Sequence, residues 1–281
     1  MSDERERMLE RLLHSPSYRV AYKDVDFLSG PELRAVRMEL ELLKPEFTLR
    51  EQHIRSTVVV FGSTRIVEPA VAHKRLELAR LQLADTPDDR RRQRAVARAE
   101  RIVAKSHYYE TARRFAELVS KSCQREEPHD YVVVTGGGPG IMEAANRGAH
   151  CCGAKSIGLN IRLPHEQAPN PFISPELCFQ FHYFALRKFH FILRAKALVV
   201  FPGGFGTLDE LFDALTLRQT GRMQEIPIIM FGREYWQRVI DFEHLADEGT
   251  IDDADLDLFR YAETAEEAWT MIQGFHRRHL A

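Results

Sequence analysis

Two glycine-rich segments contain the residues best suited to chemistry in this chain of 281 residues. The first, TGGGPGIME, occupies residues 135–143, and the second, FPGGFGTLDE, occupies residues 201–210. Glycine lets backbone N–H groups approach a ligand closely, and the start of a following helix adds unpaired N–H donors and partial positive charge. One such turn is also compatible with a plain strand-to-helix connection. Two of them on one sheet favour an anion site, most naturally for a phosphate.

Neither turn is a dinucleotide-binding fingerprint. Counted from Gly136, the pattern G-x-G-x-x-G would need glycine where Ile141 stands; counted from Gly204, it would need glycine where Asp209 stands. The sequence also lacks the G-x-x-x-x-G-K-S/T pattern of a P-loop. We therefore expect a ligand that is smaller than NAD and is not a magnesium-bound triphosphate.

No cofactor and no metal ion are expected. His182 and His190 are eight positions apart, and no carboxylate or cysteine at ligand spacing accompanies them. Packing or surface roles are the simpler interpretation of both histidines. None of the four cysteines forms a C-x-x-C pair, which favours reduced thiols in a cytoplasmic protein.

The elements that position the turns alternate between strands and helices. Apolar segments rich in β-branched residues predict strands at 57–61, 131–134, 156–159, 197–201 and 226–230. Helices are predicted at about 108–121, from the first glycine turn to 151, from 184, up to 219, at 235–245 and from 264. This alternation predicts an α/β fold, a Rossmann-like doubly wound parallel sheet with helices on both faces. Both glycine turns would then follow carboxyl ends of strands, where such sheets bind ligands.

Residues 1–55 are predicted to form a helical extension to a single Rossmann-like nucleotide-binding catalytic domain at 56–281. Ser29-Gly30-Pro31-Glu32 predicts a helix start, because proline suits the first helical position and an acid suits the first turn. Pro45 is expected to end this helix. An apolar stripe at helical spacing, suited to packing against a core or a second subunit, consists of Leu33, Val36, Leu40 and Leu43.

A charged helical insertion is predicted at about residues 70–106. Within it, Thr86, Pro87 and the acids at 88 and 89 predict the N-cap, the first residue and the acidic first turn of a helix. Five arginines follow: Arg90, Arg91, Arg92, Arg94 and Arg98. Their acidic neighbours and helical setting favour a solvated face over a nucleic-acid site.

The composition argues against several classes of protein. The formal net charge of −2 and the sequence pI of about 6.6 disfavour general nucleic-acid binding. The start MSDERER is charged and precedes no apolar run, so no signal peptide is expected. The longest apolar segments have only the length of a strand, so no membrane association is expected either.

The second glycine turn carries a recognisable pattern. PGGFGTLDE at residues 202–210 resembles the PGGxGTxxE motif of the Lonely Guy (LOG) family, whose members are often misnamed lysine decarboxylases. Matching segments occur in the same order, namely VFGS at 60–63, GGG at 136–138, the Arg187-Lys188 pair and QTG at 219–221. The resemblance covers roughly residues 57–245. The extension, the insertion and Glu143 are similar to the longer bacterial branch of the family.

The resemblance implies a hydrolase that cleaves the N-glycosidic bond of a nucleoside 5′-monophosphate to free base and ribose 5-phosphate. It implies Glu210 and Arg187 as the catalytic residues. A carboxylate beside the ribose can stabilise the positive charge that develops there and position or activate water. A guanidinium can orient the substrate or stabilise charge on the leaving base. Asp209 lies about a hundred degrees around the helix from Glu210, so it either faces solvent or stabilises the helix.

The remaining candidate residues would bind the nucleotide. Those assigned to the phosphate and substrate are Gly137, Gly138, Gly203, Gly204, Gly206, Thr207 and Lys188. Ser63 and Arg65 follow the first strand and either reach the nucleotide or shape the turn. Among the aromatic residues around Arg187, Phe184 is the candidate for stacking on the base.

The sequence leaves more than one substrate, activity and assembly open. AMP-like nucleotides and cytokinin riboside monophosphates are both candidate substrates. A non-catalytic nucleotide sensor or molybdenum-cofactor carrier on the same scaffold would use the glycine turns, but would not need Arg187 and Glu210 together. A homo-oligomer built on a dimer is expected because the family resemblance implies a dimeric unit, and a hexamer is one candidate assembly.

Overall fold

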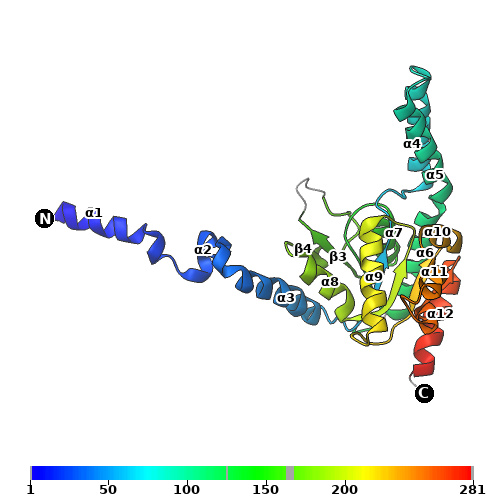
Figure 1. The fold of residues 1–281 in the computed structure, drawn as a ribbon. Coiled ribbons are helices and arrows are strands. Elements are labelled where there is room, and N and C mark those ends of the chain that lie inside the picture. Colours follow the sequence, from blue (N-terminus) through cyan, green and yellow to red (C-terminus); the bar gives the residue numbers. More distant parts are fainter. Residues whose placement is uncertain (1, 125, 163–167, 280–281) are drawn as a thin grey trace. The chain divides into compact units, whose positions relative to one another are not determined.

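The computed structural model describes residues 2–124, 126–162 and 168–279, which build one parallel sheet (Figure 1). Within these residues the sheet has seven strands in the order β4-β3-β2-β1-β5-β6-β7, and every neighbouring pair is parallel. The strands are β1 (Thr57–Phe61), β2 (Val132–Thr135), β3 (Ser156–Ile161), β4 (Cys178–Phe181), β5 (Ala195–Val200), β6 (Ile228–Phe231) and β7 (Phe259–Ala262). Helices pack on both faces, which confirms the predicted Rossmann-like fold.

The central strand β1 shows how the sequence builds a core on each face. Side chains alternate across a strand, so Val58 and Val60 face one core while Val59 and Phe61 face the other. The first core is covered by α6 (His107–Cys123), α7 (Ile141–His150) and α12 (Ala265–His279). The second is covered by α8 (Phe184–Leu193), α9 (Phe205–Gln219), α10 (Arg233–Val239) and α11 (Phe242–Asp247).

The strand order reverses between β1 and β5. β1 pairs with β2 on one side and with β5 on the other, and chain order runs outward in both directions from that point. Open α/β sheets bind ligands outside the carboxyl ends of the strands at such a reversal. The two glycine turns follow β2 and β5, so they flank β1 at this edge.

Some predicted elements are wrong in detail. The strand predicted from Tyr131 begins at Val132, because Tyr131 has a positive φ of 51° that extended backbone does not adopt. The helix predicted at 235–245 is two helices, α10 and α11, since Ile240 is extended and the Asp241 side chain caps α11. The edge strands β4 and β7 were not predicted, because each has four residues with mixed exposure and no continuous apolar run.

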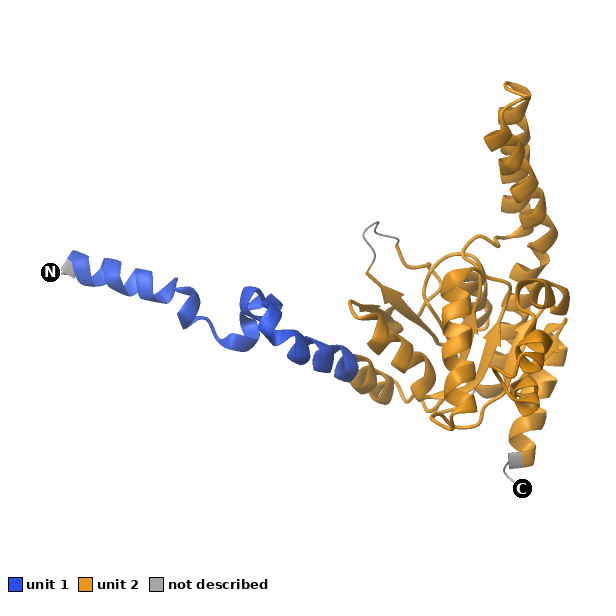
Figure 2. Cartoon of the chain, in the orientation of Figure 1, with its two compact units in different colours: residues 1–44 blue, residues 45–281 orange. Residues whose placement is uncertain are grey.

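The amino-terminal residues 2–44 form a separate compact unit, and residues 45–281 form the other (Figure 2). The first unit contains α1 (Ser2–Leu13), α2 (Val25–Ser29) and the beginning of α3 (Arg34–Glu51). The prediction that Pro45 ends its helix is wrong, because α3 continues to Glu51. Pro45 and Leu49 are both buried, and this burial offsets the roughly 3 kcal/mol that proline costs inside a helix. Short 3₁₀ turns complete the chain at Pro16–Tyr18, Ala21–Lys23, Pro31–Leu33, Pro175–Leu177 and Asp253–Leu258.

The charged insertion is a helical hairpin of α4 (Pro69–Ala84) and α5 (Arg90–Lys105) that projects from the sheet domain (Figure 1). The predicted N-cap Thr86 is wrong. The Thr86 N–H bonds the carbonyl of Leu83, whereas the Asp89 carboxylate accepts from the first amides of α5, those of Arg91 and Arg92.

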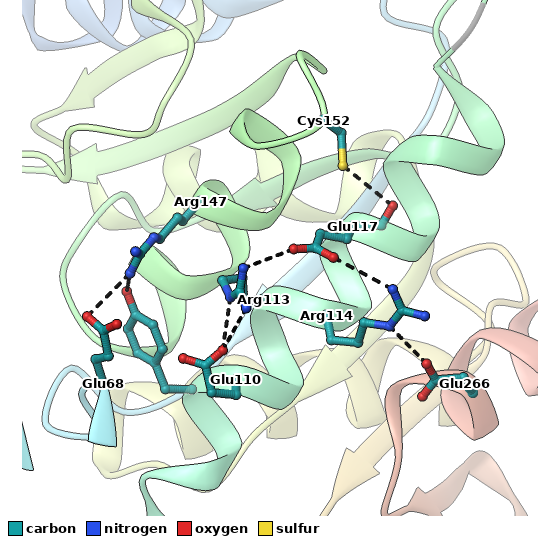
Figure 3. Close-up of polar contacts among 9 residues, drawn as sticks. Glu68, Glu110, Arg113, Arg114, Glu117, Arg147, Cys152 and Glu266 are labelled. Carbon is teal, nitrogen blue, oxygen red and sulfur yellow. Dashed lines mark hydrogen bonds and ion pairs between the residues drawn. The ribbon is translucent and has the colours of Figure 1, made fainter. Parts of the chain in front are cut away.

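Polar contacts join α7 to the root of the hairpin and join α6 to its neighbouring helices; Figure 3 shows several of them. Arg147 of α7 pairs with Glu68, which directly precedes α4, at 3.3 Å. Tyr109 of α6 donates to Glu143 of α7 at 3.1 Å. Arg114 pairs with Glu266 at 2.9 Å and joins α6 to α12. The glutamate at 143 therefore holds α6 against α7.

No helix among the described residues combines the length and the apolar character needed to cross a membrane.

Candidate active site

Ser63 lies between the two glycine turns. Its backbone N–H donates to the carbonyl of Pro202 at 3.1 Å, and its carbonyl accepts from the N–H of Ile141 at 3.2 Å. A Cβ on Gly140 would lie 2.4 Å from the Ser63 carbonyl oxygen, so the close approach requires glycine there. The loop after β1 thus ties both turns to one edge. Ser63 serves the turn geometry, and its hydroxyl accepts from the Arg65 N–H at 3.1 Å.

The second turn leaves open space where a ligand would approach. A Cβ on Gly203 would lie 2.1 Å from Thr207 Oγ1, which makes glycine structurally necessary at 203. In contrast, a Cβ on Gly204 or Gly206 would meet no protein atom within 4 Å. α9 begins here without a side-chain cap, so its first N–H groups lack intrahelical acceptors. Phe205, between the two open glycines, is 91% exposed. This helix start is suited to an anion.

The first turn is held more tightly by its own chain. The Gly137 N–H donates to Thr135 Oγ1 at 3.0 Å, and the Gly137 carbonyl accepts from the Asn170 N–H at 2.8 Å. The Asn170 side chain donates to the Gly138 carbonyl at 3.1 Å and to Asn146 at 3.0 Å. The Gly137 N–H is therefore already used. These bonds hold Gly137 and Gly138 in place, and the second turn offers the free donors.

Arg187 and Glu210 meet above the carboxyl edge of the sheet. Arg187 of α8 and Glu210 of α9 are 3.7 Å apart from Nη1 to Oε1, and their side chains are only 13% and 10% exposed. Arg187 Nε donates to the carbonyl of Leu159 in the second half of β3 at 2.7 Å, and its guanidinium lies over the Phe191 ring. A Cβ on Gly136 would lie 2.5 Å from Arg187 Nη2. Glycine at 136 thus makes room for the arginine beside the first turn.

Burial controls the charge of this pair. It raises the pKa of Glu210 from 4.5 to about 7, although Arg187 and Lys188 act in the opposite direction. Burial also lowers the pKa of Arg187, and the neighbouring Glu210 and Asp209 offset part of that effect. A guanidinium remains protonated at neutral pH. Near pH 7 the site therefore contains a fixed positive charge and a carboxyl group that exchanges a proton readily.

Glu210→Gln is expected to stabilise the fold at alkaline pH. The folded-state pKa of Glu210 is raised, so its stability contribution is complete below the unfolded-state pKa and is lost as pH rises through about 7. A rise from 4.5 to about 7 corresponds to roughly 3 kcal/mol at most between the two protonation states. Thermal unfolding should show the variant more stable than the unmodified chain at pH 8.5 and equal to it at pH 4. A variant that is less stable at pH 8.5 contradicts the buried-carboxylate assignment.

Lys188 is held by carboxylates of α9. Its Nζ lies 2.8 Å from Asp209 Oδ1 and 2.7 Å from Asp213 Oδ2. Lys188 thus joins α8 to α9 through one carboxylate before Glu210 in the chain and one after it. The structural partner of Asp209 is therefore Lys188. Lys188 also lines a groove of about 1210 Å³ near Ala195, at the amino-terminal edge of the sheet, opposite the glycine turns. In this structure its contacts position the two helices and do not reach the turns.

The aromatic candidate Phe184 is exposed, whereas the histidine His190 is buried. Phe184, at the first position of α8, is 51% exposed. His190 is buried, with Nδ1 3.6 Å from Glu46 Oε1, so it packs in the interior. Among the described residues no group of three or more His, Cys, Asp or Glu side chains is arranged to hold a metal ion.

Several residues that support the turns were not predicted from the sequence. Tyr235 donates its hydroxyl to the Gly203 carbonyl and fixes the second turn. Asn160, the second-last residue of β3, lies close to Gly137. A Cβ on Gly137 would be 2.2 Å from Asn160 Oδ1. Thr135, Asn146 and Asn170 form the buried network behind the first turn. Only Thr135, adjacent to the glycines, had a local sequence signal.

The fold and this edge define a Rossmann-like protein with an open, uncapped helix start beside a buried arginine–glutamate pair. A family model described as "Possible lysine decarboxylase" matches residues 142–272, which include the pair and the second turn. A rice protein (Oryza sativa subsp. japonica), the probable cytokinin riboside 5′-monophosphate phosphoribohydrolase LOG4, is 26% identical over 145 residues. That match covers 50% of this chain and 61% of the rice protein. The chain is therefore similar to proteins of the LOG family over about half of its length.

Two solved structures are also similar to this chain. The molybdenum cofactor binding protein of the phototrophic bacterium Rippkaea orientalis is 18% identical, with a TM-score of 0.43, over 60% of this chain and 87% of that one. The structure of TM1055 is 22% identical, with a TM-score of 0.48, over 78% of this chain and 99% of that one.

Proposed function

We propose that this chain hydrolyses the N-glycosidic bond of nucleoside 5′-monophosphates and releases the free base and ribose 5-phosphate. The buried Arg187–Glu210 pair is the observation that carries the proposal. It lies at the edge where the open helix start of α9 offers its N–H groups to a phosphate. An anion held there places the rest of a nucleotide near the carboxylate.

The proposed reaction uses the pair as follows. Water adds to C1′ of the ribose, the C1′–N bond breaks, and its electron pair leaves with the base. The Glu210 carboxylate stabilises the positive charge that develops on the ribosyl group and accepts a proton from the attacking water. The Arg187 guanidinium, fixed by the Leu159 carbonyl, holds the carboxylate and stabilises negative charge on the departing base. The base takes up a proton, so the reaction consumes one water and needs no further reactant.

The monophosphate is the preferred substrate class in this proposal. Gly204 and Gly206 leave room for a phosphate, and neither turn carries the fingerprint of a dinucleotide site. AMP-like nucleotides rank slightly ahead of cytokinin riboside monophosphates, because the extension and the insertion resemble the longer bacterial branch. The activity named for the rice relative supports cytokinin monophosphates as the second candidate.

A nucleotide sensor or a molybdenum-cofactor carrier is the main competing function. Such a protein would use the same glycine turns, but binding alone does not require a buried carboxylate with a pKa of about 7. The amino-acid decarboxylase suggested by the family description is a weaker alternative. Lys188, the lysine beside the site, is occupied by Asp209 and Asp213.

The test of the proposal is a nucleotide panel. Purified protein is incubated with AMP, GMP, CMP, an isopentenyladenosine monophosphate and adenosine, and free base is quantified by chromatography over time. Base release from at least one purine monophosphate, with adenosine far slower, supports the proposal. Tight nucleotide binding without base release from any compound would favour the sensor or carrier function.

We also propose a homo-oligomer that contacts itself through α8. Phe184, Phe189 and Leu193 of this helix are 51%, 48% and 44% exposed, which is much apolar surface for one short helix. Phe189→Asp should therefore reduce the sedimenting mass by at least half at micromolar concentration. Val239→Asp, at a 42% exposed position on α10, is the matched control and should leave the mass unchanged. A concentration-independent monomer of 32.5 kDa for the unmodified chain contradicts this proposal.

A further inference from the structure

The second helix of the projecting hairpin carries an uninterrupted basic stripe. At 100° per residue, five cationic side chains of α5 fall within about 80° of one another and span about 22 Å along the helix. These stripe residues are Arg90, Arg94, Arg98, Arg101 and Lys105. No carboxylate shares the face, because Glu100 lies on another side of α5 and pairs with Arg80 of α4 at 2.9 Å.

The stripe is not neutralised within its own chain. Among the described residues, none of the five stripe residues forms an ion pair, and α5 contains no buried residue. The acids at the tip of the hairpin do not reach the stripe, since Asp89 caps α5 and lies beside Arg92. Like charges at neighbouring helical positions repel one another. An opposing anionic surface would remove that repulsion.

A surface of opposite charge is present on the same chain. Between Arg238 and Arg260 the sequence contains eight Asp or Glu residues and no Lys or Arg. This acidic segment includes α11 and the 3₁₀ turn Asp253–Leu258. Four exposed carboxylates in it form no hydrogen bond or ion pair with the described residues: Glu243, Asp247, Glu248 and Asp253.

The two surfaces do not satisfy each other within one molecule. α5 packs against α4 and the start of α6, and no ion pair joins the stripe to the acidic segment in the described chain. The hairpin of α4 and α5 projects from the sheet domain in Figure 1, and Glu68 at its root pairs with Arg147 in Figure 3. The complementary surfaces are thus available to different copies.

Apolar features favour a protein partner over a nucleic acid. Leu78 and Leu81 of α4 are 56% and 67% exposed on the same hairpin. The acidic segment surrounds a pocket of about 90 Å³ that Leu245, Ile251 and Leu258 help to line. A cavity of that size admits an aliphatic side chain. A nucleic-acid backbone would offer the exposed leucines no such pocket. The net charge of −2 would also repel those parts of a polyanion that extend beyond the stripe.

We propose that the hairpin of one copy docks on the acidic segment of a second copy, with the stripe residues facing the four free carboxylates. A reciprocal arrangement, in which each copy gives its stripe and its acidic segment, forms two such contacts. The contact is separate from the α8 surface, so it would join units already formed through α8. Because exposed charges carry it, the association weakens as salt screens them.

Charge reversal tests the contact in the full-length chain. One variant carries Arg94→Glu and Arg98→Glu, and the other carries Glu243→Lys and Asp247→Lys. In a complex of two copies of the same variant, the stripe and the acidic segment carry the same charge and repel. In a complex of one copy of each variant, both stripe–acidic segment contacts join opposite charges. Arg277→Glu with Arg278→Glu on α12 is the control that matches the first variant in net charge. Sedimentation velocity at low and high salt measures the assembly, and circular dichroism checks the fold.

The expected result is a larger species for the unmodified chain and the control than for either reversed variant, with recovery in the mixture. Each reversal should raise the dissociation constant of this step by about tenfold or more. Unchanged sedimentation of both variants would overturn the proposal, as would two weakened variants whose mixture does not recover. If the Arg94/Arg98 variant instead loses binding to a labelled RNA or DNA oligonucleotide while its assembly is unchanged, the stripe is a nucleic-acid surface and the proposal is wrong.

Discussion

Glu210→Gln is expected to lower kcat for AMP hydrolysis by about a hundredfold or more. Glutamine keeps the size of the side chain and part of its hydrogen bonding, but it cannot carry negative charge or accept the proton of water. The charge on the ribosyl group develops only in the transition state, so the loss falls on kcat and not on binding. Positioned acid–base and electrostatic groups commonly contribute this much. Steady-state rates with direct measurement of AMP affinity separate the two effects.

Asp209→Asn is the matched control for that variant. Asp209 precedes Glu210 on the same helix, but its side chain is 55% exposed and pairs with Lys188. Its replacement also removes one negative charge and should change kcat only a few-fold, because an exposed ion pair contributes little. If Glu210→Gln retains the rate of the unmodified chain, or if both variants lose activity equally, the catalytic assignment of Glu210 is wrong.

Gly204→Val is expected to weaken AMP binding by at least about tenfold while leaving the fold intact. A Cβ at 204 meets no protein atom within 4 Å, and the backbone there has a negative φ of −100°, so valine fits the folded chain. Its side chain would fill the space through which a phosphate reaches the first N–H groups of α9. Charge-assisted hydrogen bonds contribute about 1.5–3 kcal/mol each, so loss of one reduces affinity about tenfold or more. Calorimetric titration with AMP and adenosine measures the change.

The comparison of AMP with adenosine decides whether Gly204→Val acts on a phosphate site. The loss should be large for AMP and small for adenosine, because only AMP uses the helix start. Gly274→Val in α12, where a Cβ also meets no protein atom, is the control and should leave both affinities unchanged. Gly203→Ala should instead disturb the turn itself, since a Cβ would lie 2.1 Å from Thr207 Oγ1. Equal weakening of AMP and adenosine by Gly204→Val contradicts the phosphate site.

The central strands could be predicted because burial on both faces leaves a continuous apolar run. β1 was predicted with its observed limits, and all five of its residues are buried. The edge strand β4 alternates exposed and buried residues over only four positions, which is too short for a distinct period. Pro45 shows the opposite failure. A strong local rule was overridden by tertiary burial of the last turn of α3.

The sequence motifs of the site could be predicted, but the contacts between residues from different helices could not. The second glycine turn and Glu210 lie in one contiguous pattern, so sequence alone assigns them together. The contact between Arg187 and Glu210 joins two helices and depends on how α8 and α9 pack, which no spacing in the sequence states. Likewise, Asn170 and Tyr235 support the turns from distant segments. Lys188 was assigned to the substrate as part of the Arg187-Lys188 pair of the resemblance, and its contacts with Asp209 and Asp213 depend on the packing of α8 on α9.

A single-turnover reaction shows whether the Arg187–Glu210 edge breaks the C1′–N bond. Protein in excess over AMP is sampled over time, and adenine and ribose 5-phosphate are quantified in the same samples, for the unmodified chain and for Glu210→Gln. The unmodified chain should convert all bound AMP to the two products in equal amounts. The variant should bind AMP equally well and form the products at least about a hundredfold more slowly. AMP that stays bound and intact in the unmodified chain would contradict the proposed hydrolysis.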